Sequence, residues 1–200
     1  MKKIALFASG HGTNVQQIMD YFKDSNNIKI DVVIVNKRDS YARERAKNKG
    51  VDNLYFNRDD FYNSDKVLEE LKKREIDMIV LAGFLLLIPQ NLIDNFPNAI
   101  INIHPALLPK YGGKGMYGHF VHEAVIANKE KESGITIHYV NDRYDEGQTI
   151  FQAKCEVSPN DTPDDLAAKI HLLEKEYFPK VIESILEQIN LTQNLKLEKN

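Results

Sequence analysis

Tryptophan is missing from this sequence of 200 residues, and cysteine occurs only once, at Cys155. A single cysteine cannot form a disulfide within the chain, so a small disulfide-stabilised fold is excluded and a reducing compartment, the cytoplasm, is expected. An excess of positive charge is missing as well, since the net charge is -3. Because the chain offers no broad basic surface, we expect no nucleic-acid partner.

Long apolar runs are also missing. No apolar run approaches the length that spans a bilayer, so we expect no membrane segment. The apolar stretch behind the N-terminal lysines covers only residues 4–8, which is too short for the core of a signal peptide. With 42% hydrophobic residues the chain can still bury a full core. We predict one domain over residues 1–200, with a frayed tail at about 190–200.

Short apolar runs alternate with segments of helical periodicity up to residue 110. The expected strands are 4–8, 32–35, 54–56, 78–81 and 99–104, and the expected helices are 15–22, 41–49, 65–74 and 89–95. This alternation predicts an α/β fold with a mainly parallel twisted sheet and helices on both faces, a Rossmann-like arrangement.

The pattern changes after residue 110. A glycine-rich loop at 112–118 and a helix at 119–127 precede two alternating segments, 135–140 and 149–154, which predict antiparallel strands toward the C-terminal part. Asp161 or Thr162 caps a long final helix that begins at Pro163. Its expected inward stripe is Leu166, Ile170, Leu173, Tyr177, Val181 and Ile185.

The first candidate site is the loop between the first strand and the first helix. Gly10 and Gly12 permit a tight turn there, and Thr13 and Asn14 add polar side chains. Backbone amides at a helix start favour an anion, so a phosphate site is predicted rather than a plain turn. The loop is not a complete G-x-G-x-x-G, because Val15 takes the third glycine's place. The second strand is followed by Asn36, Lys37 and Arg38 and not by an acidic residue that could hold a ribose, so an NAD site is disfavoured, whereas NADP stays open.

The second candidate site is the pair Asn102 and His104, at the end of the strand before a proline-bounded turn. Residues two apart on a strand point to the same face, and open α/β sheets bind ligands at this edge. An amide can donate to an oxyanion and an imidazole can move a proton. The alternative is a satisfied core histidine beside a capping asparagine. What the pair lacks is a carboxylate.

The hairpin turn at residues 141–147 offers three acids, Asp142, Asp145 and Glu146, and spacing alone does not choose among them or exclude a solvated turn.

Three further candidates are weaker. His119 and His122 lie one helical turn apart and could share a metal, but no third ligand is evident, so a surface position is favoured. Cys155 has no adjacent base and is interpreted as structural. Glu174 lies close to the apolar stripe of the last helix, either as a stripe-edge charge or as a carboxylate aimed into a cleft.

With these elements in place, the chain resembles the folate-dependent formyltransferases. The matching segments, in the family's order, are SGHGTN at 9–14, LAGF at 81–84, NIHPALLP at 102–109 and D-x-G-x-x-I-x-Q at 145–152. They span nearly the entire chain. The third segment marks the wider family, and the glycine loop narrows the resemblance to the members that act on phosphoribosylglycinamide in purine biosynthesis.

The resemblance implies a role for each matching residue. It assigns catalysis to Asn102, His104 and Asp145, and so selects Asp145 from the acids of the turn. It places the substrate phosphate at Gly12, Thr13 and Asn14, and it aims Glu174 at the same substrate. The implied folate pocket is lined by Leu85, Leu86, Leu87, Ile88, Asn102, Asn141, Asp142, Arg143, Tyr144 and Asp145. Leu86 stands where some relatives carry arginine, and loop 112–118 looks longer than in familiar members.

The implied reaction is formyl transfer from 10-formyltetrahydrofolate, as co-substrate, to the glycinamide amine through a tetrahedral oxyanion, without a metal. Asn102 would donate to the oxyanion, while His104, oriented and kept charged by Asp145, stabilises it. The expected partners are therefore small molecules only, and the expected assembly is a monomer or a homodimer.

Four other functions share parts of this pattern. A formyltetrahydrofolate hydrolase would use the same three residues, with a regulatory domain expected in front of them. A formyltransferase acting on initiator tRNA would need a nucleic-acid module behind them. An NADP-dependent oxidoreductase is the fold-level alternative, and a sugar-phosphate sensor would bind the ligand without turning it over.

Overall fold

A single sheet runs through most of the chain in the computed structural model, which describes the backbone of residues 1–197 and the side chains of residues 1–188. Its seven strands lie in the order β3-β2-β1-β4-β5-β6-β7. Their bounds are β1 Lys2–Ala8, β2 Ile28–Val35, β3 Asp52–Tyr55, β4 Met78–Leu81, β5 Ile100–His104, β6 Glu132–Tyr139 and β7 Thr149–Glu156. The strands from β1 to β5 pair in parallel, and β6 and β7 pair antiparallel, which confirms the predicted fold class.

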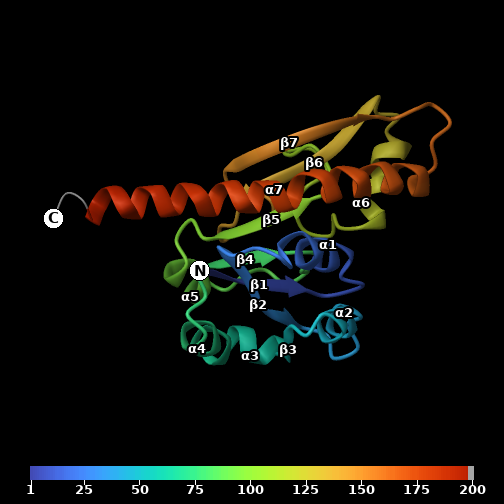
Figure 1. The fold of residues 1–200 in the computed structure, drawn as a ribbon. Helices are drawn as coiled ribbons and strands as arrows, with labels where there is room; N and C mark the ends of the chain where they lie inside the picture. Colours follow the sequence, from blue (N-terminus) through green and yellow to red (C-terminus); the bar gives the residue numbers. More distant parts are fainter. Residues whose placement is uncertain (198–200) are drawn as a thin grey trace.

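Helices cover both faces of the sheet (Figure 1). One face carries α1 Thr13–Phe22, α2 Ala42–Asn48, α6 His119–Ala127 and α7 Pro163–Leu197, and the other carries α3 Arg58–Tyr62, α4 Lys66–Lys73 and α5 Gln90–Asn95. Neighbouring residues of β1 enter different cores, Leu6 that of the first face and Phe7 that of the second. A strand covered on both faces reads as a continuous apolar run, which is why β1 and β4 were recognisable from sequence.

One short helix, α3, was not predicted. Asn57 caps it, and a capping box with Asp60 closes its first turn. Only Phe61 of its five residues is buried, too little apolar periodicity to mark a helix in the sequence.

The last helix begins as predicted, with a cap at Thr162, whose Oγ1 accepts from the Asp165 amide at 3.2 Å. Its buried stripe differs from the prediction. The fully buried positions continue from Ile170 to Phe178 and Ile182, whereas Leu173, Tyr177 and Val181 are half-buried. Glu174 therefore stands in the middle of the stripe and not at its edge. The helix extends to Leu197, the fraying expected at about 190–200 stays a prediction, and residues 198–200 lie outside the described chain.

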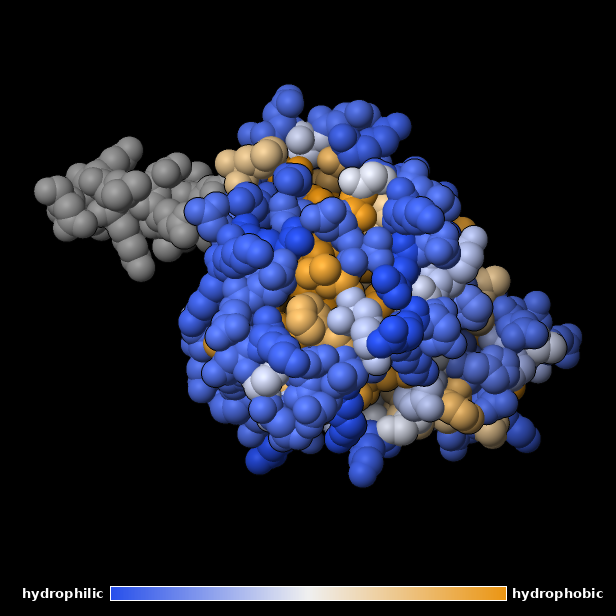
Figure 2. Space-filling view, turned by 90° about the horizontal axis from the view of Figure 1, so that it is seen from below, coloured by the Kyte–Doolittle hydropathy of each residue, from blue (hydrophilic) through white to orange (hydrophobic). Residues whose placement is uncertain are grey.

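Within the part of the chain that the structure describes, no helix has the length and apolar character that crossing a bilayer needs. Figure 2 views the side on which α3 and α4 lie and shows a largely hydrophilic surface with apolar side chains in a central recess.

Candidate active site

The loop before α1 takes a conformation that favours glycine. Gly12 is the N-cap residue of α1, with φ 70° and ψ 32°, and a Cβ placed on it would lie 2.6 Å from the Cβ of Ala42. No side chain caps the helix, so the backbone N–H groups of its first turn stay available to donate to a ligand. The Oδ1 atom of Asn14 is buried without a hydrogen-bond partner. Thr13 is exposed beside it. The loop has the geometry of an anion site at a helix start.

The chain segment before and within α2 holds this loop in place. Ser40 Oγ donates to the Gly10 carbonyl at 2.8 Å, and Arg45 Nε donates to the His11 carbonyl at 2.8 Å. Both carbonyl oxygens thus have hydrogen-bond donors of their own, which reduces their repulsion of an incoming anion. Ser9 Oγ accepts from the Leu85 amide at 2.9 Å and so connects the loop to the segment that follows β4. The motif itself carries no signal for these contacts.

We predict that Gly12→Ala weakens substrate binding, because the loop that positions the first-turn amides of α1 has to move. The new methyl group must displace Ala42 or the loop, and alanine with a positive φ costs about 1 kcal/mol. We therefore expect the KM for the phosphorylated substrate to rise about tenfold or more, since 1.4 kcal/mol corresponds to a factor of ten. Steady-state kinetics measures this. Gly50→Ala is the control, because Gly50 has φ 68° but open space around it. An equal KM in both variants would contradict the prediction.

The three residues proposed for catalysis meet at the carboxyl end of β5. Asp145 Oδ2 lies 3.5 Å from His104 Nδ1, and Asp145 Oδ1 lies 3.4 Å from Asn102 Nδ2. The amide of Gly113 donates to Asp145 Oδ2 at 2.9 Å. Asp145 itself has φ 57°, and a Cβ on Gly147 would lie 1.7 Å from the carbonyl oxygen of Tyr139. The turn is thus shaped to bring Asp145 over the end of the strand.

The sequence interpretation missed His138. This residue faces Asn102 in the antiparallel register of β5 and β6. Its Nδ1 lies 2.8 Å from the Tyr139 carbonyl and must carry the proton, so its Nε2, at 3.1 Å, accepts from Asn102 Nδ2. His138 Nε2 also lies 3.6 Å from Asp145 Oδ1. The alternation of residues 135–140 puts His138 on the same face of β6 as Thr136, and only the register with β5 shows which face that is.

Thr136 and Gln152 hold the turn that follows His104. Thr136 Oγ1 donates to the Ala106 carbonyl at 2.7 Å and accepts from the Leu108 amide at 3.0 Å. Gln152 Nε2 donates to Thr136 Oγ1 at 2.9 Å and lies 3.1 Å from the Leu108 carbonyl. The two antiparallel strands therefore buttress the proline-bounded turn.

The tautomer of His104 follows from its partners. Its Nε2 lies 2.7 Å from the Tyr111 carbonyl, which can only accept, so Nε2 carries a proton and Nδ1 faces Asp145. Burial lowers the pKa of His104, although Asp145 and the Tyr111 carbonyl act in the opposite direction. Asp145 was expected to keep this imidazole charged, but burial favours its neutral form and lowers the pKa overall.

Asp145 itself is held as a carboxylate. Burial would raise its pKa, but the neighbouring His138, the charge of His104 and the Gly113 amide together lower it.

A second group of histidines lies where α6 meets α7. His119 is exposed and pairs with Glu123 and Asp164, but His122 is only 4% exposed and its Nδ1 has no partner. The expected surface position of His122 is therefore wrong, because the residue faces α7 and not the solvent. Among the described residues, no group of three or more His, Cys, Asp or Glu is arranged to hold a metal.

The buried His122 should make the protein sensitive to mild acid. Burial, reinforced by His171, His119 and His104 and opposed by Asp164, lowers the pKa of His122 to about 4. The unfolded chain binds a proton at its ordinary pKa of about 6.5, so stability is lost as pH falls from 6.5 toward 4. At pH 5 this loss is about 2 kcal/mol.

Urea unfolding at pH 7.5 and pH 5 measures the effect, and His122→Gln should show a smaller loss than the wild type. His119→Gln, one turn earlier and 54% exposed, is the control. The same pH dependence in the wild type and in His122→Gln would refute the assignment.

Glu174 lies on α7 and is buried, with 5% of its surface exposed. Its Oε2 lies 2.9 Å from His171 Nδ1, and this hydrogen bond raises the pKa of His171 against the effect of burial. Its carboxylate is thus partnered, and its contact with substrate stays a prediction.

The two segments expected to line a folate pocket come together around Tyr62, which the sequence interpretation also missed. Tyr62 Oη donates to the Leu87 carbonyl at 2.7 Å, and burial together with the nearby Tyr144 raises the pKa of Tyr62. Leu85 is exposed, whereas Ile88 is 3% exposed and belongs to the second core.

The other expected lining residues are half-buried or exposed: Leu86, Leu87, Asn141, Asp142 and Arg143. A cavity of about 500 Å³ opens beside Asp145, between residues 108–113 and 144–149.

Comparison with known proteins agrees with this geometry. Residues 2–182 match the formyl transferase family. The chain is 38% identical to the chloroplastic phosphoribosylglycinamide formyltransferase of Arabidopsis thaliana, over 94% of this chain and 66% of that protein, so it spans slightly less than two thirds of that relative. It is 36% identical to phosphoribosylglycinamide formyltransferase of Haemophilus influenzae, over 98% and 92% of the two chains.

Among solved structures, glycinamide ribonucleotide transformylase 1 from Geobacillus kaustophilus superposes with a TM-score of 0.84 at 34% identity, covering 93% of this chain and 99% of that one. The family match, these identities and the shared fold lead to one conclusion: the chain belongs to the formyl transferase family.

Proposed function

We propose that this protein transfers a formyl group from 10-formyltetrahydrofolate to the amine of phosphoribosylglycinamide, a step of purine biosynthesis. The observation that carries the proposal is the convergence of Asn102, His104 and Asp145 at the carboxyl end of β5, beside an open cavity. The names of the relatives at 36% and 38% identity support the substrate pair.

The proposed reaction starts from two substrates bound end to end. The phosphate sits at the first-turn amides of α1, at Gly12, Thr13 and Asn14, while Glu174 faces the same substrate. The folate lies along residues 85–88 and 141–145. Holding the amine against the formyl carbon removes much of the entropic barrier.

The chemistry then needs one oxyanion site and one proton path. The amine nitrogen attacks the formyl carbon, and the carbonyl oxygen becomes an oxyanion to which Asn102 Nδ2 donates. The proton of the amine passes to His104 Nδ1 or Asp145, whose carboxylate lies 3.5 Å away. The bond from carbon to the folate nitrogen breaks as that nitrogen takes up the proton, which leaves the formylated amine and tetrahydrofolate.

The proposal includes no metal and no covalent enzyme intermediate, since these groups suffice for acyl transfer between two amines. It also takes the substrates to be small molecules, the protein to act in the cytoplasm without nucleic acid or membrane, and the assembly to be a monomer or a homodimer.

One experiment tests the proposal. The protein is mixed with glycinamide ribonucleotide and 10-formyltetrahydrofolate, and products are followed by mass spectrometry. Formylated ribonucleotide together with tetrahydrofolate is the expected result. Formate with tetrahydrofolate, and no formylated amine, would favour the hydrolase, and the absence of any turnover would refute both.

A further inference from the structure

The backbone of residues 111–113 contacts both groups proposed to handle the proton. The Tyr111 carbonyl accepts from His104 Nε2 at 2.7 Å, and the Gly113 amide donates to Asp145 Oδ2 at 2.9 Å. Gly112, between them, has no room for a side chain, because a Cβ would lie 2.5 Å from Leu108 Cδ2 and 3.2 Å from the Cβ of Asp145. The placement of this backbone therefore sets the orientation of the imidazole and the carboxylate.

Tyr111 has a backbone conformation that is costly for its side chain. Its φ is 57°, in the left-handed region, where a bulky residue is strained by about 1–3 kcal/mol. Such a residue keeps its conformation only when its surroundings hold it there. The question is which contacts hold Tyr111.

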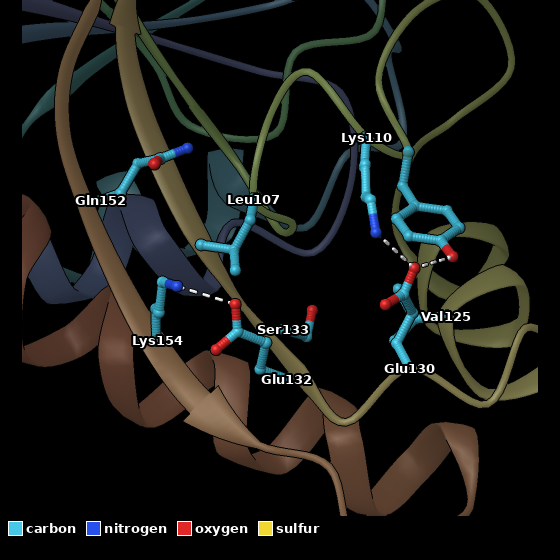
Figure 3. A pocket seen from close by; sticks show the side chains of 9 residues that line it. Leu107, Lys110, Val125, Glu130, Glu132, Ser133, Gln152 and Lys154 are labelled. Carbon is cyan, nitrogen blue, oxygen red and sulfur yellow. Dashed lines mark hydrogen bonds and ion pairs between the residues drawn. The ribbon is translucent and has the colours of Figure 1, made fainter.

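Close packing holds this segment only in part. Tyr111 is half-buried and packs against the core of the first face. A cavity of about 190 Å³ lies against residues 107–111, and Figure 3 shows it between Leu107, Ser133 and Glu130. The hydroxyl of Ser133 points into this space and has no hydrogen-bond partner. Leu107 and Val125 contribute the apolar part of the wall.

A carboxylate across the cavity adds polar contacts to this packing. Glu130 Oε1 accepts from Tyr111 Oη at 2.9 Å and from Lys110 Nζ at 2.9 Å. The bond from Lys110 is drawn in Figure 3. Glu130 is itself tied to the end of α6, because its amide donates to the Val125 carbonyl at 3.3 Å. The side chain of Lys110 is 68% exposed, whereas Tyr111 is half-buried, so Tyr111 is the better shielded of the two donors to Glu130.

We propose that Glu130 is a positioning residue for His104, acting through the phenol of Tyr111 and the Tyr111 carbonyl. Glu130 holds the strained tyrosine, and the tyrosine carbonyl keeps the proton on Nε2 and turns Nδ1 toward Asp145. The inference rests on the proposed function for its kinetic consequence, but its structural consequence for His104 does not.

The kinetic test uses two conservative variants, Tyr111→Phe and Glu130→Gln. Each removes or weakens the hydrogen bond between the phenol and the carboxylate while keeping a side chain of nearly the same size. We expect each to lower kcat about tenfold with little change in either KM, since a small misplacement of a catalytic group acts on the reacting state. The double variant should be no slower than the slower single one, because both changes break the same contact.

Glu132→Gln is the matched control. Glu132 lines the same cavity two residues further on, but its carboxylate pairs with Lys154 at 2.7 Å, whereas Tyr111 and Lys110 donate to Glu130. This variant removes the same charge and should keep the wild-type kcat.

A second measurement separates this inference from the proposed function. The titration of His104 is followed by NMR in the wild type and in the three single variants, without substrate. The groups that face His104 are Asp145, His138, His122 and the Tyr111 carbonyl. Because that carbonyl favours the protonated imidazole, Tyr111→Phe and Glu130→Gln should move the titration to lower pH, and Glu132→Gln should not.

Unchanged kcat and unchanged His104 titration in both variants would overturn the inference. If the wild type turns over no substrate but the titration shifts as described, the proposed function fails and the positioning role stands.

Discussion

Replacement of Asp145 by asparagine is expected to lower turnover by about a thousandfold, by analogy with amide-for-carboxylate changes that disturb a catalytic imidazole. The carboxylate accepts from the Gly113 amide and lies within 3.6 Å of His104, His138 and Asn102. An amide at this position cannot take a proton and turns a donor toward one of its neighbours. KM for each substrate should change far less than kcat, since the carboxylate acts on the moving proton.

Asp94→Asn is the matched control for this change. Asp94 is exposed on α5 and accepts from Gln90 Nε2 at 2.7 Å. It loses the same charge and should keep the wild-type turnover. Kinetics of both variants at several pH values, with circular dichroism to verify folding, decides the matter. A decrease in turnover of less than tenfold in Asp145→Asn would show that the carboxylate is not required for proton transfer.

Asn102→Ala should lower turnover by about a hundredfold or more, as expected for the loss of an oxyanion donor. Its two Nδ2 hydrogens face His138 Nε2 at 3.1 Å and Asp145 Oδ1 at 3.4 Å, so the amide is oriented before substrate binds. Donation to the oxyanion then replaces the longer of these two contacts. The loss should fall on kcat and not on KM, because the oxyanion exists only in the reacting state.

The comparison for this variant is Asn95→Ala, which removes an exposed amide that donates to the Asn91 carbonyl at 2.8 Å. Wild-type turnover in Asn102→Ala, measured at saturating concentrations of both substrates, would exclude the oxyanion role.

Much of the fold could be predicted because it depends on local pattern. The runs at β1 and β4 are apolar without interruption, and the helices between them show a 3.6-residue period. The cap at Thr162 and Pro163 was recognisable for the same reason. Helix α3 was not, since its five residues are too few to show a period.

The residues of the candidate site differ in the same way, because some could be recognised from local sequence and others could not. The residues of the glycine loop are neighbours in sequence, and so are Asn102 and His104, so each group indicates a candidate site by its residue types alone. The choice of Asp145 came from family resemblance. His138 and Tyr62 were missed because their neighbours in space lie 36 and 25 residues away in sequence.

By itself, then, the sequence determined the order of the strands and of all helices but α3, the end of the sheet where ligands are expected and the residues most typical of formyl transfer, since each depends on neighbours along the chain. Only the tertiary structure decided which turn acid reaches His104, that burial opposes the charge on this imidazole, that His122 is interior, and that the Tyr111 carbonyl selects the protonated nitrogen. Those outcomes depend on strand register, on burial and on a strained backbone, which bring together atoms from distant parts of the chain.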